Sequence, residues 1–269
     1  MSTLATTATE RLQSLISDPR LPALHSLSLD TARAPLRASQ LLNNDTLTQL
    51  LERYGQRFPG CDRRAVVSLW SKGYFEALFP PLLAASLRLE LRLPIALEQL
   101  GIAVNERGTP VLIVLENAGH IMDSADQAPL QICTLFHDNL RPYVEHVARF
   151  GKVSVRALWG NVAAYLAWAM NLLVQHQWIA PARALEIRAL FSAQLLPDGT
   201  TNPLHSAYQF DTGDGQPRRK VCCLRYQLPA LPYCADCPLT CGAPRKKPPR
   251  LSSAAATNNN KIKNIRFSP

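Results

Sequence analysis

The chain has 269 residues, of which 47% are hydrophobic and 18% charged, as in an ordinary globular protein with a sizeable core. The net charge of +9 is concentrated at one end, because seven of the 29 basic residues and no acidic residue lie in 242–269. The other 22 basic residues face 20 acidic ones, so the charge of the main body does not indicate a nucleic-acid-binding domain.

The two ends of the chain differ in composition from the main body, and we expect no secretory signal at the N-terminus. Residues 242–269 are rich in Pro, Ser, Ala and Asn, and we expect a disordered basic tail without a nucleic-acid partner. The N-terminus lacks a basic cluster followed by an apolar run, and the longest apolar stretches fall short of the roughly 20 residues of a membrane helix. We therefore expect a cytoplasmic protein with at most peripheral contact with the inner membrane face.

Helical periodicity dominates the chain after an N-terminal extension, 1–40. Leucines and a tyrosine recur on one face of 45–58, which predicts a helix with Asp45 as its N-cap. Apolar residues at three- to four-residue steps predict a second helix over 62–79. We expect Pro80-Pro81 to break or kink it, because proline lacks the N–H that a helix interior requires.

The middle of the chain contains one strand pair and three further helices. The stretch 101–116 alternates and is rich in β-branched residues on both sides of a turn from Asn105 to Gly108, which predicts a β-hairpin. Long amphipathic runs predict helices over 129–150, with a kink at Pro142, over 154–176 and over 181–196.

A second hairpin is predicted over 206–223, with its turn at Gly213–Gly215, and it leads directly into clustered cysteines. We therefore predict a mainly α protein with small β-hairpins, of the α+β class. A helical body, 41–200, would be followed by a C-terminal cysteine-cluster segment, 201–241.

Four cysteines of this segment have the spacing C-C-x10-C-x2-C: Cys222, Cys223, Cys234 and Cys237. Adjacent cysteines do not bridge without strain, and structural disulfides are rare in the cytosol. A C-x-x-C pair is typical of zinc and iron sites, but zinc ribbons usually repeat that pair. A two-iron cluster accepts an irregular ligand set more readily, so the spacing favours an iron–sulfur site and leaves a zinc-stabilised, non-catalytic binding module as the alternative.

The string "CCLRYQLPALPYCADC" (222–237) closely resembles the cluster motif of the FhuF-type siderophore-iron reductases. Three further segments resemble that family in the same order, "SLWSKGYFEALFPPLL" (68–83), "ALWGNVAAYLAW" (157–168) and "NPLHSAY" (202–208). The resemblance covers roughly residues 60–240. Cys241 departs from the pattern, which needs four cysteines.

The resemblance implies a [2Fe–2S] cluster held by Cys222, Cys223, Cys234 and Cys237. It also implies an enzyme, a ferric-siderophore reductase that transfers one electron to Fe(III) in hydroxamate siderophores and releases Fe(II) in the cytoplasm. Because the chain has no glycine-rich phosphate loop, we expect the electrons to come from another protein, such as a ferredoxin, a flavodoxin or a reductase.

Several residues beside the motif are candidates for supporting roles. The basic residues Arg218, Arg219, Lys220 and Arg225 bracket the adjacent cysteines and would raise the cluster potential or attract an acidic donor, unless they are merely solvated. Trp159 and Asn161 are candidates for part of a siderophore pocket, and Arg218 and Arg219 are further candidates for contact with the substrate. Aromatic residues at helical spacing nevertheless more often belong to the core. We expect Cys61 and Cys133 to be buried thiols on helical faces.

Overall fold

The computed structural model describes residues 7–123, 128–205, 207–209, 218–229 and 231–240. The helices are α1 (Ala8–Ile16), α2 (Asn44–Gly55), α3 (Arg63–Arg88), α4 (Ala128–Leu135), α5 (Arg141–Gly151), α6 (Val155–Gln175) and α7 (Pro181–Ser192). Short 3-10 turns are η1 (Pro22–Ser26), η2 (Thr31–Arg33), η3 (Ala38–Leu42), η6 (Arg225–Gln227) and η7 (Pro238–Thr240), and η5 (Phe136–Leu140) is a π-helical turn.

The strands form three small sheets. They are β1 (Leu27–Ser28), β2 (Leu36–Arg37), β3 (Leu91–Arg92), β4 (Leu100–Val104), β5 (Pro110–Leu115), β6 (His120–Ile121), β7 (Tyr208–Gln209) and β8 (Arg218–Arg219). The largest sheet has the order β1-β5-β4-β2, and the other two are the antiparallel pairs β3-β6 and β7-β8. The predicted mainly α fold with small sheets is confirmed.

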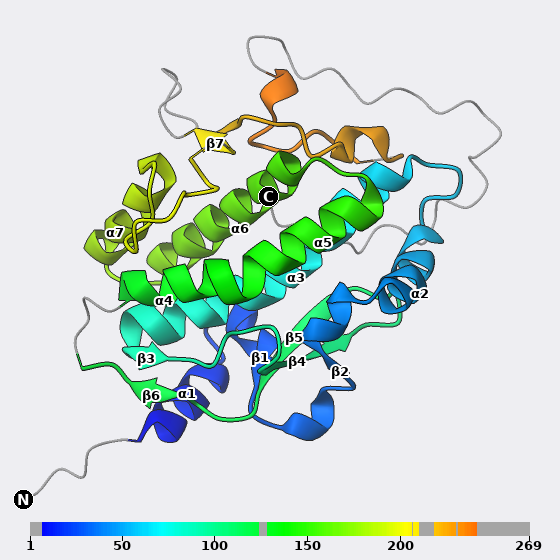
Figure 1. Cartoon of the computed structure of the whole chain (residues 1–269). Coiled ribbons are helices and arrows are strands. Elements are labelled where there is room, and N and C mark those ends of the chain that lie inside the picture. The colour runs from blue at the N-terminus through cyan, green and yellow to red at the C-terminus, as the bar shows by residue number, and fades with distance from the viewer. Residues whose placement is uncertain (1–6, 124–127, 206, 210–217, 230, 241–269) are drawn as a thin grey trace, which may run out of the picture.

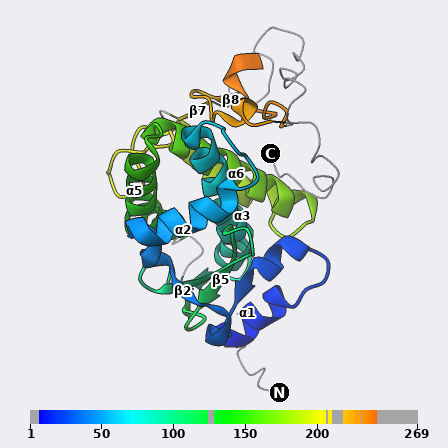
Figure 2. The ribbon, with the colours of Figure 1, turned by 90° about the vertical axis from the view of Figure 1, so that its right-hand side faces the viewer.

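The helix α3 is the centre of the molecule and packs against α6, α5, β5 and η1. In Figure 1, α3, α5 and α6 run side by side, and the four-stranded sheet lies against one end of this layer. The view in Figure 2 places the C-terminal segment that contains β8 at the opposite end of the helices from α1 and the sheet. The cysteine segment therefore packs on the core helices, where η6 contacts α3.

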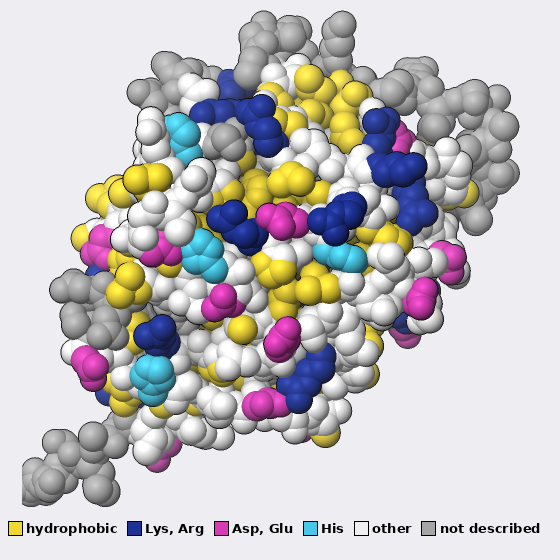
Figure 3. All heavy atoms as spheres, viewed as in Figure 1, with side chains coloured by type: hydrophobic (Ala, Val, Ile, Leu, Met, Phe, Trp, Pro, Cys, Tyr) yellow, Lys and Arg dark blue, Asp and Glu magenta, His cyan; other side chains and the backbone are white. Residues whose placement is uncertain are grey.

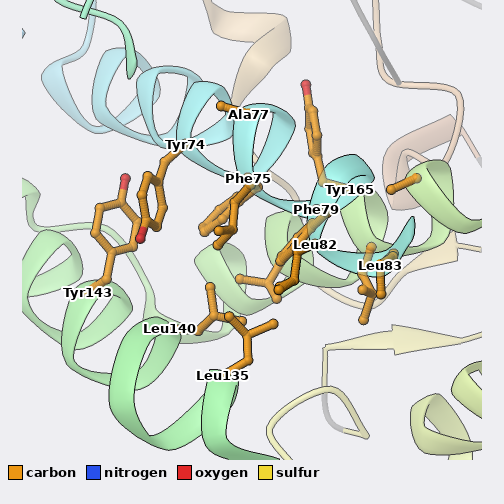
Figure 4. Packing of buried hydrophobic residues seen from close by; sticks show 14 of the residues in the cluster. Tyr74, Phe75, Ala77, Phe79, Leu82, Leu83, Leu135, Leu140, Tyr143 and Tyr165 are labelled. Atoms are coloured by element: carbon orange, nitrogen blue, oxygen red, sulfur yellow. The ribbon is translucent and has the colours of Figure 1, made fainter. Parts of the chain in front are cut away.

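Aromatic side chains fill the space between α3 and α5 (Figure 4). The rings of Tyr74 and Tyr143 lie 4.7 Å apart, and Phe75 stacks on Phe79 at 5.8 Å. The buried Tyr74 hydroxyl donates to Asn139 Oδ1 at 2.9 Å. This packing fixes the position of α3, which carries one residue of the site described below.

The prediction that Pro80-Pro81 breaks the second helix is wrong, because α3 continues through both prolines to Arg88. Proline at position 81 has no N–H for the carbonyl of Ala77, four residues earlier. The hydroxyl of Ser26 donates to that carbonyl at 2.8 Å. The tertiary contact thus replaces the missing helical hydrogen bond, and burial of the surrounding helix stabilises it further.

Other helix boundaries also differ from the predictions. The N-cap of α2 is Asn43 and not Asp45, because the Asn43 side chain accepts hydrogen bonds from the backbone N–H groups of residues 45 and 46. The helix predicted over 129–150 is divided by η5, and Pro142 lies in the first turn of α5, where its missing N–H costs nothing. The last predicted helix ends earlier, at Ser192.

The predicted hairpins correspond to strand pairs. β4 pairs with β5, and the Asn105 side chain accepts hydrogen bonds from two backbone N–H groups in the turn between them. β7 pairs with β8, and the predicted Gly213–Gly215 turn lies outside the described residues. The segment 1–40 contributes β1 and β2 to the main sheet, so its described part is integrated into the body.

The helix α6 is long and apolar enough to span a membrane, contrary to the expectation from the sequence. However, 78% of its most apolar window is buried inside the protein, where it packs against α3, α5 and α7. Its apolar character is therefore that of a core helix.

Candidate metal centre

The cysteine segment is irregular, and this irregularity brings its thiols together. β8 ends at Arg219, so the adjacent Cys222 and Cys223 do not belong to a strand. Leu224 has a left-handed backbone with φ of +63°, and its N–H donates to Cys222 Sγ at 3.3 Å. The chain turns here, so both sulfurs of the adjacent pair have partners in the C-x-x-C motif.

The four thiols form two pairs. The sulfurs of Cys223 and Cys234 lie 3.1 Å apart, and the thiols of Cys222 and Cys237 are hydrogen-bonded to each other. The described cysteines are all free, and 3.1 Å is well above a disulfide bond length. Three of the four side chains are buried, and Cys222 is partly exposed.

One thiol of each pair is more acidic than an ordinary cysteine. The hydrogen bond from Cys234, followed by the charges of Lys72 and Arg219, lowers the pKa of Cys223 well below its usual value. The hydrogen bond from Cys222 lowers the pKa of Cys237 to about 7. The donating thiols, Cys222 and Cys234, have raised pKa values for the same reason. Each pair thus combines one thiol of lowered pKa with one of raised pKa.

A buried lysine from α3 reaches the thiols from the helical body. The ammonium group of Lys72 donates to Cys223 Sγ at 3.6 Å and to Cys234 Sγ at 3.8 Å, and the side chain is only 3% exposed. Its attraction to Cys223 is one of the causes of the low pKa of that thiol. The sequence did not reveal this role, although Lys72 is the one cation within a run of otherwise uncharged residues from Ala65 to Phe75.

A second buried cation, Arg219, ties the segment to the body. Its Nε donates to Asp236 Oδ2 at 2.7 Å, and its Nη1 donates to Asn161 Oδ1 on α6. The amide of Asn161 also donates to the carbonyl of Ser68 on α3, at 2.9 Å. The chain Ser68–Asn161–Arg219–Asp236 therefore runs from α3 through α6 to the loop between Cys234 and Cys237.

The residues proposed to contact the substrate or to tune the cluster lie in different environments. Arg219 and Arg225 are buried, so the solvated interpretation is wrong for them, while Arg218 is partly exposed and Lys220 exposed. Asn161 is fully buried and positions Arg219. Trp159 is 5% exposed and packs against Phe136. The structure thus places Trp159 and Asn161 in the core, and neither of them lines the two cavities described below.

The remaining cysteines lie apart from this cluster. Cys133 is buried in α4, as predicted, and burial raises its pKa. Cys61 lies in the turn between α2 and α3, so its predicted place on a helical face is wrong, because the helix begins only at Arg63. Burial also raises the pKa of Cys61. Cys241 lies outside the described residues.

The four thiols and their surroundings fit an anionic, thiolate-held group. Two buried cations, Lys72 and Arg219, act on the thiols, whereas Asp236 is the buried carboxylate beside them. Arg219 Nη2 is buried and has no hydrogen-bond partner among the described atoms. The positive charges of Lys72 and Arg219 would stabilise the negative charge of a group with four thiolate ligands.

Within the described ranges, no three or more His, Cys, Asp or Glu side chains are placed to hold a metal ion as they stand. The pairing of the thiols is nevertheless the ligand pattern of a two-iron cluster, in which each iron takes two thiolates. On the face shown in Figure 3, basic side chains lie mainly in the half nearest the C-terminal segment and acidic ones mainly in the other half. The surroundings of the segment therefore also favour an anionic group or partner.

Comparison with known proteins gives matches over both parts of the chain. Residues 68–216 match the family model "Ferric iron reductase FhuF-like transporter", and residues 219–239 match the model "FhuF 2Fe-2S C-terminal domain". A protein from Escherichia coli (strain K12) named "Ferric siderophore reductase" is 26% identical over 242 residues, which cover 87% of this chain and 91% of that protein. The cofactor indicated for the cysteine segment is thus a [2Fe–2S] cluster and not zinc.

Proposed function

Because the chain belongs to the FhuF-like ferric iron reductase family, we propose that it reduces Fe(III) held in hydroxamate siderophores by one electron and so releases Fe(II). One observation carries this proposal. The buried Lys72 ammonium contacts the sulfurs of Cys223 and Cys234, and the second thiol pair, Cys222 and Cys237, lies beside them. These groups combine the ligands of an electron carrier with a fixed positive charge.

The ligands in this proposal are Cys222, Cys223, Cys234 and Cys237. When bound, the [2Fe–2S] cluster supplies a one-electron carrier whose potential depends on nearby charges, hydrogen bonds and solvent exposure. The chain controls each of these. Lys72 and Arg219 place positive charge at the thiolates, Leu224 N–H donates to Cys222 Sγ, and burial of the other three thiols limits access of water.

The chemistry of the substrate explains why one electron is sufficient. Hydroxamates hold Fe(III) through hard oxygen donors, and the less charged, softer Fe(II) is held more weakly by the same atoms. A reductase of this kind needs no nucleophile and no general base. It needs a site for the chelate close to the thiolates and a supply of electrons.

Electron supply and location belong to the same proposal. We infer an external donor protein, a ferredoxin, flavodoxin or reductase, because the sequence offers no nucleotide-binding loop of its own. The partly exposed Arg218 and exposed Lys220 beside the cysteines would attract an acidic donor surface. The reaction would take place in the cytoplasm, where free cysteines remain reduced.

Anaerobic reduction of a panel of ferric siderophores by the dithionite-reduced protein tests this function. We expect the purified protein to be brown, to bleach with dithionite and to form Fe(II) from ferric hydroxamates. Cys234→Ser should lose the visible absorption and the reaction, whereas Cys133→Ser, in α4, should keep both. A colourless wild-type protein with stoichiometric zinc, or a reduced protein that leaves every ferric siderophore unchanged, would contradict the proposal.

A further inference from the structure

A cavity of about 620 Å³ is lined by Lys72, the side chain that also contacts the thiols. Its walls come from five parts of the chain: η1, the C-terminal end of α2, α3, α6 and the turn between β4 and β5. Lys72 lines this cavity and also contacts the sulfurs of Cys223 and Cys234. One side chain therefore contacts both the cavity and the proposed cluster site.

The volume and lining of this cavity suit a chelate of siderophore size. Small-molecule sites usually enclose about 300–1,000 Å³ and combine apolar walls with a few polar groups. Tyr165 and Trp168 form an aromatic wall on α6, with ring centroids 5.7 Å apart, and Leu69 and Ala77 add apolar surface from α3. A second cavity, beside β2 and β5, encloses about 180 Å³, below this range.

The charged residues of the cavity favour a chelate that becomes negative on reduction. Arg57, Lys72 and Arg107 line it together with a single carboxylate, that of Glu76. A neutral ferric trihydroxamate becomes an anion when its iron gains one electron. Positive lining stabilises that anion more than the neutral substrate, which is the differential binding that favours the reduced state.

We propose that this cavity is the ferric-chelate site, that it takes neutral trihydroxamate complexes, and that Lys72 forms the wall between chelate and cluster. This inference rests on the proposed function, since it names where the substrate of that reaction binds. In the reaction, the chelated Fe(III) gains one electron and the reduced cluster loses one, and no proton or other group is transferred. The external donor protein would supply the electron for each turnover.

Val111 offers a way to fill the cavity without touching the thiols. It lines the cavity from β5, and its side chain is 43% exposed, so a larger residue would extend into the open space. Val155, at the start of α6, has the same residue type and the same 43% exposure but does not line the cavity. Val111→Trp and Val155→Trp are therefore a matched pair.

The test uses the cluster-containing full chain and a neutral gallium(III) trihydroxamate complex as the probe. Gallium(III) has the charge of Fe(III) but does not accept the electron, so calorimetric titration measures binding alone. We expect Val111→Trp to weaken binding at least tenfold and Val155→Trp to change it less than twofold. Trp168→Ala, which removes the aromatic wall, should also weaken binding several-fold, and it serves as the second variant if Val111→Trp does not fold.

The outcomes show whether the proposed binding site or the proposed function is wrong. If the filled-cavity variant and Trp168→Ala bind gallium complex as tightly as the wild type, while the wild type reduces the ferric complex, the chelate binds elsewhere and this inference fails alone. If the wild type binds no gallium complex, the cavity is not the site. If the reduced wild type leaves ferric complexes unchanged, the proposed function fails.

Discussion

Replacing Lys72 by methionine should lower the potential of the iron–sulfur cluster. The Lys72 ammonium lies 3.6 Å from Cys223 Sγ and is only 3% exposed, so solvent screens its charge weakly. At that distance and an effective dielectric constant of about 20, one added electron is attracted by about 4.6 kcal/mol. For a one-electron couple this corresponds to about 190 mV, since about 59 mV is a tenfold change.

The expected shift in midpoint potential is smaller than this value, because the added electron spreads over the irons and sulfurs of the cluster. We expect Lys72→Met to lower the midpoint potential by about 100 mV, or roughly half of the value for a charge at Cys223 Sγ. Anaerobic redox titration, followed by visible absorption, measures the shift directly. Methionine has a similar volume without the charge, so packing against the thiols is largely preserved.

Two further variants distinguish the effect of the Lys72 charge on the potential from the effect of its packing. Lys72→Arg keeps the charge and should stay within about 30 mV of the wild type. Lys220→Met removes an exposed cation only two residues before Cys222, and solvent screening should limit its effect to about 20 mV. A Lys72→Met potential within about 20 mV of the wild type would refute the electrostatic reasoning.

Two other predictions concern stability. Asn161→Leu leaves the buried Arg219 and the Ser68 carbonyl without their amide partner, so the free energy of unfolding should fall by about 2–4 kcal/mol in urea titrations; a loss below about 0.5 kcal/mol would contradict the role given to Asn161. Burial, followed by the charge of Arg149, lowers the pKa of His146 below 6.5. The unfolded chain then binds more protons there, so stability should fall as the pH drops below about 6.5. His146→Gln should reduce this dependence, measured as melting temperatures at pH 5.5 and 8; equal slopes would exclude His146 as its source.

Much of the fold was predictable because its signals are local. Apolar periodicity located the helices and alternation located the main hairpin. The continuation of α3 through Pro80-Pro81 was not predictable, since the hydroxyl that satisfies the Ala77 carbonyl comes from Ser26, 51 residues earlier. Local rules for proline assume that the freed carbonyl finds no other donor.

The candidate site was also predictable only where its residues lie close together in the sequence. The spacing of the four cysteines identified the segment, because the ligands are close in sequence. The cations around them were harder to assign. The sequence left open whether Arg219 is solvated or acts on the cluster, and its contacts with Asn161 and Asp236 bury it. Lys72 contacts a thiol 151 residues away, and no pattern in the sequence joins two residues across that distance.

The same separation has a consequence for how the protein is made. During synthesis on the ribosome, Lys72 emerges with the helical body long before Cys223 and Cys234. Until those thiols arrive, the body holds a buried ammonium group without the sulfurs that accept its hydrogen bonds, which opposes tight packing around α3. The nascent body should therefore stay loosely packed and open to proteolysis until the last part of the chain docks. Loading of iron and sulfide would then be the final step of folding as well as the start of activity.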